Sequence, residues 1–396
     1  MGDATTRRPA EPDSAQAWLV VGATFLATFT VFGIVYSFNA FFRSMADTFG
    51  TGSAVTSLMF AITTAWYFAV GVFSGRLTDR IGPRPLLIVS AFLLAGGLIA
   101  TSTVDSIWLG FVTYAAGAGS AVGCAYVPMV STVGAWFVRR RTAALGVSVA
   151  GIGVGTLLFS PLAARLIDAY GWRTAYVILG VIGGSLLLVA SLGALRPPVD
   201  VTQEAPDLRA TVRSRGFVVL YVANLLVSTS LFVPFVFIKA YAEGRGIDPG
   251  RAAWLVGIIG ASSIVGRLGL GTLGARLGSA RLMQLSFAAL SLSFLIWLAA
   301  GSSFILLVVF SVAMGVGYGG FIALAPAVSA QIFGVRGLGV VLGLLYTAAG
   351  IGGLIGPPLA GWLIDSSGYS TAIITAMVIA LAATASLSAL PKSRVA

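Results

Sequence analysis

The chain has 396 residues, of which 58% are hydrophobic and 9% are charged, and its formal charge is +11. A soluble domain carries roughly 25% charged residues, so this composition cannot cover a water-exposed surface and indicates a polytopic membrane protein. The absence of His and the presence of a single Cys, Cys124, exclude the usual zinc, iron–sulfur and Ser-His-Asp or Cys-His centres.

Apolar stretches long enough to cross a bilayer recur along the whole chain. Residues 1–16 are polar and lack the apolar run of a cleavable signal, so we expect a cytoplasmic tail followed by a retained first span. We predict twelve spans, at residues 17–42, 55–75, 85–103, 107–134, 142–165, 174–195, 217–241, 252–274, 282–300, 303–332, 338–361 and 371–390.

A long polar stretch, residues 196–216, divides six spans from six and is expected to be a cytoplasmic linker. It separates an N-terminal bundle at 17–195 from a C-terminal bundle at 217–390, and residues 391–396 form a second tail. With both termini inside, 17 Lys and Arg residues fall on the inner side and six at outer ends. This asymmetry follows the positive-inside rule and explains the basic charge without nucleic-acid binding.

The two halves of the sequence resemble each other. PLAARLIDAYGWRTA at 161–175 recurs as PLAGWLIDSSGYSTA at 358–372, and GRLTDRIG at 75–82 falls on GTLGARLG at 271–278. A direct repeat of six spans implies two bundles related by an axis along the membrane normal, with a binding site between them. The repeated acids Asp168 and Asp365 end their spans outside, and we expect them to cap turns or to pair with Arg165 or Arg173.

The loop GRLTDRIGPRP at 75–85 resembles the cytoplasmic signature of the major facilitator superfamily. The resemblance implies an all-α membrane fold of twelve transmembrane helices in two six-helix bundles related by pseudo-two-fold symmetry. It also implies a cytoplasmic gate formed by Gly75, Asp79, Arg80 and Arg84, in which Asp79 belongs to a latch that holds the outward-facing state. The alternative is that the loop only sets topology. The second copy has Ala275 in place of the Asp.

Two further segments, AWFVRRRTAALGVSVAGIGVG at 135–155 and GIVYSFNAFFRSM at 33–45, resemble the monocarboxylate transporter family. Its animal members carry a Lys where Tyr36 stands and an acid where Ser263 stands, so the bacterial branch, which includes the oxalate–formate exchanger, is the nearer comparison. The resemblance places Arg267 at a pathway arginine of the family. We expect a functional monomer in the inner (plasma) membrane of a bacterium, with both termini cytoplasmic.

The charges restrict the substrate. All 13 acidic residues fall in tails, loops or span ends, so no carboxylate lies at mid-membrane to hold a cation. Arg267 is the sole cation well inside a span, where burial costs roughly 2.5–3.5 kcal/mol. A substrate carboxylate could bind its guanidinium bidentately; alternatively, Arg267 snorkels to the headgroups or bonds backbone carbonyls.

Polar and aromatic residues of the pore-lining spans could complete a pocket around Arg267, although each could equally serve helix packing. They are Tyr36, Asn39, Tyr126, Asn224, Ser263, Tyr318, Phe321 and Tyr346. We therefore predict a secondary transporter of a small monocarboxylate such as lactate or pyruvate, moving with a proton, surrounded by lipid and needing no metal or cofactor. The alternatives are an organic-anion exchanger, an exporter of uncharged compounds and a non-transporting membrane sensor.

Overall fold

The computed structural model describes residues 11–197, 208–333 and 338–390, which form helices joined by short turns and, within those ranges, no strand. The helices are α1 (Ala15–Tyr36), α2 (Phe38–Phe49), α3 (Ser53–Ile81), α4 (Pro83–Ser102), α5 (Ile107–Tyr114), the π-helix η1 (Ala115–Gly119), α6 (Ser120–Trp136), α7 (Arg141–Leu192), α8 (Leu208–Arg213), α9 (Arg215–Gly244), α10 (Pro249–Leu277), α11 (Ser279–Ala300), α12 (Phe304–Phe333), α13 (Leu338–Ser367), α14 (Tyr369–Ser386) and the 3-10 helix η2 (Leu387–Ala389).

Eleven stretches of the described chain are long and apolar enough to cross a membrane, and one of them contains two helices joined across a kink. That stretch, Ala143–Leu192, has 50 residues, about 75 Å of helix, more than twice the roughly 30 Å hydrocarbon thickness. Gly171 interrupts α7 with φ 77° and ψ 160°, a conformation that glycine adopts readily because it has no Cβ. The predicted spans 142–165 and 174–195 both lie in α7, on either side of this break.

Packing on α1 shows that the chain reverses direction at Gly171. In the first half of α7, Gly151 lies against Phe25 and Gly155 lies against Phe29, so the two segments run parallel. In the second half, Gly183 lies against Ile34 and Gly193 lies against Ala23, so that segment runs antiparallel to α1. The described residues therefore make twelve crossings, as the sequence predicts.

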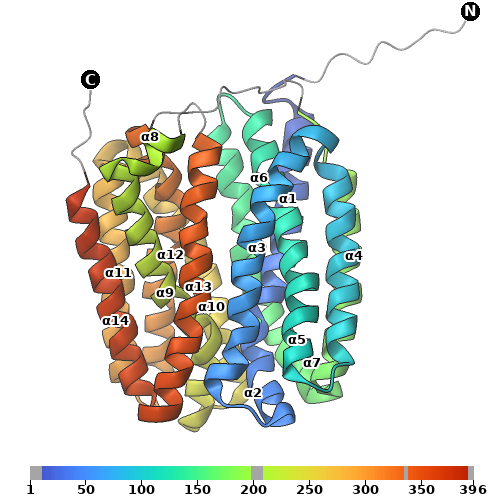
Figure 1. Cartoon of the computed structure of the whole chain (residues 1–396), viewed down its shortest axis with the longest axis vertical. Coiled ribbons are helices and arrows are strands. Elements are labelled where there is room, and N and C mark those ends of the chain that lie inside the picture. The colour runs from blue at the N-terminus through green and yellow to red at the C-terminus, as the bar shows by residue number, and fades with distance from the viewer. Residues whose placement is uncertain (1–10, 198–207, 334–337, 391–396) are drawn as a thin grey trace, which may run out of the picture.

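Helices α1 to α7 lie on one side of the molecule and α9 to α14 on the other (Figure 1). We call these groups the N-terminal half and the C-terminal half. The start of α1, helix α8 and the end of α14 lie at one end of the molecule, the terminal end, whereas α2 lies at the opposite, distal end (Figure 1).

The two halves are joined at the distal end by an ionic cluster. Arg43 of α2 donates from Nη1 to Glu243 of α9 at 3.2 Å. Lys239, one turn earlier on α9, donates to the same carboxylate at 2.6 Å. The Glu243 side chain is 6% exposed, so its charge is enclosed by the two cations.

A second distal contact crosses between the halves at Asp365, the last acid of α13. Its carboxylate accepts hydrogen bonds from the backbone N–H groups of Ser53 at 3.2 Å and Ala54 at 3.1 Å. These groups open helix α3, which has no capping side chain of its own because its N-cap residue is Gly52. A Cβ on Gly52 would lie 2.8 Å from Asp365 Oδ2, so glycine makes the approach possible.

Asp365 therefore does act as a cap, one of the two expected roles, but it caps the start of a helix in the opposite half rather than a turn. The expected cation Arg173 is engaged elsewhere: it donates to the carbonyls of Ser102 and Val104 and to the carboxylate of Asp105. Asp168, the counterpart of Asp365 in the repeat, is exposed.

At the terminal end, Asp13 ties the segment before α1 to the turn between α6 and α7. Its carboxylate accepts from the backbone N–H groups of Arg139 and Arg140 at 3.1 Å and of Val138 at 3.2 Å. The bond from Arg139 is the largest influence on the carboxyl and, with those from Arg140 and Val138, it outweighs desolvation and holds the pKa of Asp13 below its ordinary value.

The residues of the expected cytoplasmic gate also lie at the terminal end, on α3 and at the start of α4. Gly75 packs on Val127 of α6, which is a contact within the N-terminal half. Arg80 and Arg84 are exposed, and the Arg80 carbonyl accepts a hydrogen bond from Arg196 at 3.3 Å. The side chain of Asp79 lies outside the described part of the structure.

Candidate functional site

Arg267 of α10 is 4% exposed and lies where the two halves meet. Close packing of α7 and α10 brings it there: a Cβ on Gly153 would collide with the Gly260 carbonyl, and one on Gly260 would lie 2.7 Å from Thr156. At this separation Arg267 Nη1 donates to the backbone carbonyl of Val149 on α7. The guanidinium thus contacts the N-terminal half although it belongs to the C-terminal half.

The other two nitrogens of this guanidinium, Nε and Nη2, are buried and have no hydrogen-bond partner among the described residues. Arg267 therefore does not snorkel to the surface in this conformation. The alternative, that the guanidinium bonds backbone carbonyls, holds for Nη1 only, which donates to Val149. Guanidinium presents its donors in a planar fork that suits a carboxylate, and the free part of that fork is available to a ligand.

Tyr318 contacts Arg267, and two further predicted tyrosines, Tyr126 and Tyr346, lie in the same cluster. The guanidinium carbon lies 5.4 Å from the centroid of the Tyr318 ring, a cation–π contact. The phenol of Tyr126 lies within electrostatic reach of Arg267, Tyr318 and Tyr346. These residues come from α6, α10, α12 and α13, so the structure brings together side chains from both halves that the sequence placed in one site.

Tyr36, the last residue of α1, joins the same cluster from the N-terminal half. Its ring lies 4.7 Å from that of Phe235 on α9, and Phe235 in turn lies 5.8 Å from Tyr318. The Tyr36 phenol is within electrostatic reach of Tyr318 and Tyr67. Aromatic side chains in contact with one another therefore extend from one half to the other beside Arg267.

Two predicted residues are engaged in helix packing. Asn39 donates to the Tyr36 carbonyl at 2.6 Å and accepts from the Ser160 hydroxyl at 3.1 Å. The Ser263 hydroxyl donates to the carbonyl of Gly260. The backbone carbonyl of Ser263 packs so closely on Gly319 of α12 that a Cβ there would collide with it. Their polar groups thus support the helices that carry the site.

Asn224 and Phe321 line a small pocket within the C-terminal half, together with Tyr346. Its volume of about 10 Å³ leaves room for about one water molecule. Asn224 donates to the Leu345 carbonyl at 2.8 Å, while its side-chain oxygen is buried without a partner among the described residues. This pocket borders the tyrosine cluster through Tyr346.

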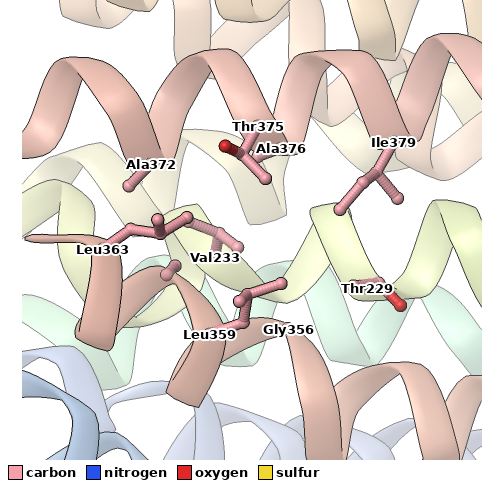
Figure 2. Close-up of a pocket in the computed structure, with 10 residues that line it drawn as sticks. Thr229, Val233, Gly356, Leu359, Leu363, Ala372, Thr375, Ala376 and Ile379 are labelled. Carbon is pink, nitrogen blue, oxygen red and sulfur yellow. The ribbon is translucent and has the colours of Figure 1, made fainter.

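A second pocket of about 10 Å³ lies between α9, α13 and α14 (Figure 2). Its lining is almost entirely apolar, with the hydroxyls of Thr229 and Thr375 as its polar side-chain groups, and no charged side chain contributes to it. It is therefore a packing gap rather than a candidate for the anion site. Within the described residues, no group of three or more His, Cys, Asp or Glu could hold a metal ion.

Two residues of α3 that were not predicted, Tyr67 and Thr64, lie beside the tyrosine cluster. Tyr67 is 2% exposed, and its ring lies 5.9 Å from that of Phe32, which also contacts Tyr126 at 5.0 Å. The hydroxyls of Tyr67 and Thr64 are both buried without a hydrogen bond of good geometry among the described residues. The signal in the sequence was weak, because a Tyr or Thr in an apolar span is as often a packing residue.

Comparisons with known proteins agree with this architecture. The family model described as Major Facilitator Superfamily matches residues 24–283 and 220–395. A solved structure of a bacterial homolog to the human lysosomal transporter Spinster, in an inward-facing and unoccupied conformation, matches with a TM-score of 0.77 at 14% identity. The match covers 97% of this chain and 99% of the other, and at this identity it supports the fold alone.

Two curated relatives from Rattus norvegicus extend over most of the chain. Monocarboxylate transporter 13 is 30% identical over 393 residues, which cover 97% of this chain and 91% of the relative. Monocarboxylate transporter 3 is 32% identical over 386 residues, which cover 92% and 78%. The chain is therefore a multi-pass membrane transporter, not an enzyme, which belongs to the major facilitator superfamily and resembles its monocarboxylate transporter family.

Proposed function

We propose that the protein moves a small monocarboxylate, such as lactate or pyruvate, across the membrane together with a proton. The observation that supports this proposal is the Arg267 guanidinium, which is buried and has two nitrogens without partners. A buried charge without a partner is costly, and a carboxylate is the ligand that satisfies both nitrogens at once. The printed names of the relatives agree with a substrate of this kind.

A single carboxylate fits the charge of the site better than two. Within the described residues, the other cation buried inside a helix, Lys239, is 7% exposed and is already bonded to Glu243 at the distal end. A dicarboxylate would leave its second charge among tyrosine and phenylalanine rings. The site therefore favours an anion with one carboxylate.

The substrate is carried by alternating access between the two halves. The distal contacts of Arg43 with Glu243 and of Asp365 with α3 are closed here, and they must break when the site opens at that end. At the terminal end the gate of Gly75, Asp79, Arg80 and Arg84 performs the opposite step. The terminal end is the cytoplasmic one in this proposal, because the loops there carry the excess of basic residues.

Purified protein in proteoliposomes tests the proposal with a panel of labelled acids. We expect uptake of lactate and pyruvate by the wild type, and a loss of at least tenfold in Arg267→Lys, because a point charge replaces a planar fork. Arg267→Ala should lose uptake as well while remaining folded, since it removes an unpaired buried charge. Arg281→Lys at the exposed start of α11 is the matched control and should transport normally.

The same vesicles separate the alternatives. Uptake that requires an internal anion would indicate exchange, and uptake into empty vesicles driven by a pH gradient would indicate symport. Normal carboxylate uptake by Arg267→Ala, at equal protein and equal thermal stability, would remove the proposed site.

A further inference from the structure

Glu243 of α9 is shared by two cations that belong to different halves of the protein. Lys239, one turn earlier on the same helix, donates to Glu243 Oε1 at 2.6 Å. Arg43 of α2, in the opposite half, donates to Glu243 Oε2 at 3.2 Å. Each cation therefore occupies its own carboxylate oxygen, and the cluster of three side chains carries a net positive charge.

The three side chains of this cluster are buried to different extents. Those of Glu243 and Lys239 are 6% and 9% exposed, whereas that of Arg43 is 54% exposed. The residue before Arg43, Phe42, anchors α2 on α9, because its ring lies 5.1 Å from that of Phe237. The carboxylate and the ammonium are therefore buried parts of α9, and the guanidinium approaches them from the water-exposed side.

The two ion pairs respond differently when the distal end opens. Lys239 and Glu243 lie four residues apart in one helix, so their side chains remain neighbours wherever the two halves stand. Arg43 moves away with the N-terminal half, and its bond to Glu243 breaks. The open form thus keeps a paired carboxylate. Without Lys239 the same carboxylate would have no cation in the open form, and a buried charge without a partner is strongly unfavourable.

Resting on the alternating access of the proposed function, we propose that Lys239 is a positioning residue that favours the distal-open form. It keeps the Glu243 carboxylate paired after Arg43 has left. In the closed form it competes with Arg43 for the same negative charge and repels the guanidinium. Both effects reduce the advantage of the closed form, so the two cations act on the distal gate in opposite directions although both bond Glu243.

Spin labels on cysteines at Ser106 and Ser302, in a Cys124→Ala background of the full-length protein, measure the distance between the distal ends of the halves. Both positions are exposed, one following α4 and the other following α11. We expect Lys239→Met to raise the ratio of the short-distance to the long-distance population about three- to tenfold, as expected for couplings within one ion-pair network. Arg43→Met should lower that ratio.

Three further variants test whether the effect of Lys239 passes through the shared carboxylate. Lys239→Arg keeps the cation and should restore the wild-type ratio. In an Arg43→Met background, Lys239→Met should no longer raise the ratio, because no cation from the opposite half then benefits from its loss. Arg245→Met is the matched control: it removes a cation two residues after Glu243 that stands over the Tyr241 ring at 5.2 Å, and it should leave the ratio unchanged.

The opposite sign would overturn the inference. If Lys239 simply strengthened the closed form, Lys239→Met would lower the ratio as Arg43→Met does. An unchanged ratio, or an increase that persists in the Arg43→Met background, would overturn it as well. The proposed substrate fails in a different measurement, the uptake of labelled acids by the Arg267 variants, because the distances report where the halves stand and not what they carry.

Discussion

The contact of Asp365 with α3 should hold the distal end closed, and Asp365→Ala should open it. The carboxylate accepts two backbone N–H groups, from Ser53 at 3.2 Å and Ala54 at 3.1 Å. These belong to a helix start without any capping side chain of its own. Because the contact joins opposite halves, it exists only while the distal end is closed, so its loss changes the equilibrium between the two orientations.

The size of the change follows from the type of contact. Removal of a capping side chain costs roughly 0.5–2 kcal/mol, and an anion at a helix start contributes roughly 0.3–1 kcal/mol when exposed. Asp365 is exposed, so we take the lower part of this range, about 1 kcal/mol, which corresponds to about a fivefold shift in the equilibrium. Asp365→Asn keeps an acceptor and should shift it less.

Spin labels on cysteines at Asp47 and Ser366 would measure the opening, in a Cys124→Ala background. Both positions are exposed at the distal end, one in each half. In Asp365→Ala we expect the population with the longer distance to grow about fivefold relative to the shorter one. Equal populations in variant and wild type would refute the assigned role.

The internal repeat supplies the control, Asp168→Ala. Asp168 stands where Asp365 stands in the other half, but the helix start it could reach, that of α10, is already capped. There, Asp248 accepts the N–H of Arg251 at 2.9 Å. Asp168→Ala should leave the distance populations unchanged, although it makes the same chemical change at the same end of the protein.

Two further predictions concern protons. Asp13→Ala should accelerate amide hydrogen exchange at Val138, Arg139 and Arg140 at pH 7. The pKa of the Asp13 carboxyl is lowered from 3.8. Protection of these amides in the wild type should therefore persist down to about pH 3.8 and be lost only as the pH falls through the lowered pKa. Symport should be electroneutral, since the described membrane helices offer no carboxylate beside Arg267 and a proton would travel with the anion. Potassium–valinomycin potentials at equal pH should therefore drive no uptake, and voltage-driven uptake would contradict the prediction.

The fold could be predicted from the sequence because the bilayer imposes simple rules on it. Spans of apolar residues appear at almost the lengths the structure shows, and the polar interval around Gly171 marks the reversal within α7. The direct repeat indicates that each half is built alike. The grouping of Arg267 with Tyr126, Tyr318 and Tyr346 followed from the single intramembrane cation and from the polar and aromatic residues of the spans expected to line the pore.

The rest depends on contacts between residues far apart in the chain. Asp365 lies in the last turn of α13 and carries no local sign that its partner is the start of α3, 311 residues away at Ala54. Tyr67 and Tyr114 are both buried tyrosines of apolar helices, and only the packing shows that Tyr67 contacts Phe32 whereas Tyr114 contacts Phe38 and Tyr176. Asn39 has the polarity of a site residue, yet its amide is bonded to Tyr36 and Ser160. Such distinctions are properties of the packed helices rather than of the local sequence.

If Arg267 binds the substrate carboxylate, as proposed, its bond to the Val149 carbonyl links substrate binding to the movement of the halves. In the closed form an empty protein buries the guanidinium with this one partner and two unsatisfied nitrogens, and an incompletely paired buried charge costs several kcal/mol. A bound carboxylate removes most of that cost, so the loaded protein closes more readily than the empty one. Exchange and symport then differ in one quantity, the rate at which the empty form closes. In the proposed mechanism the Val149 carbonyl lowers the barrier to that empty step by satisfying part of the charge, which favours symport over exchange.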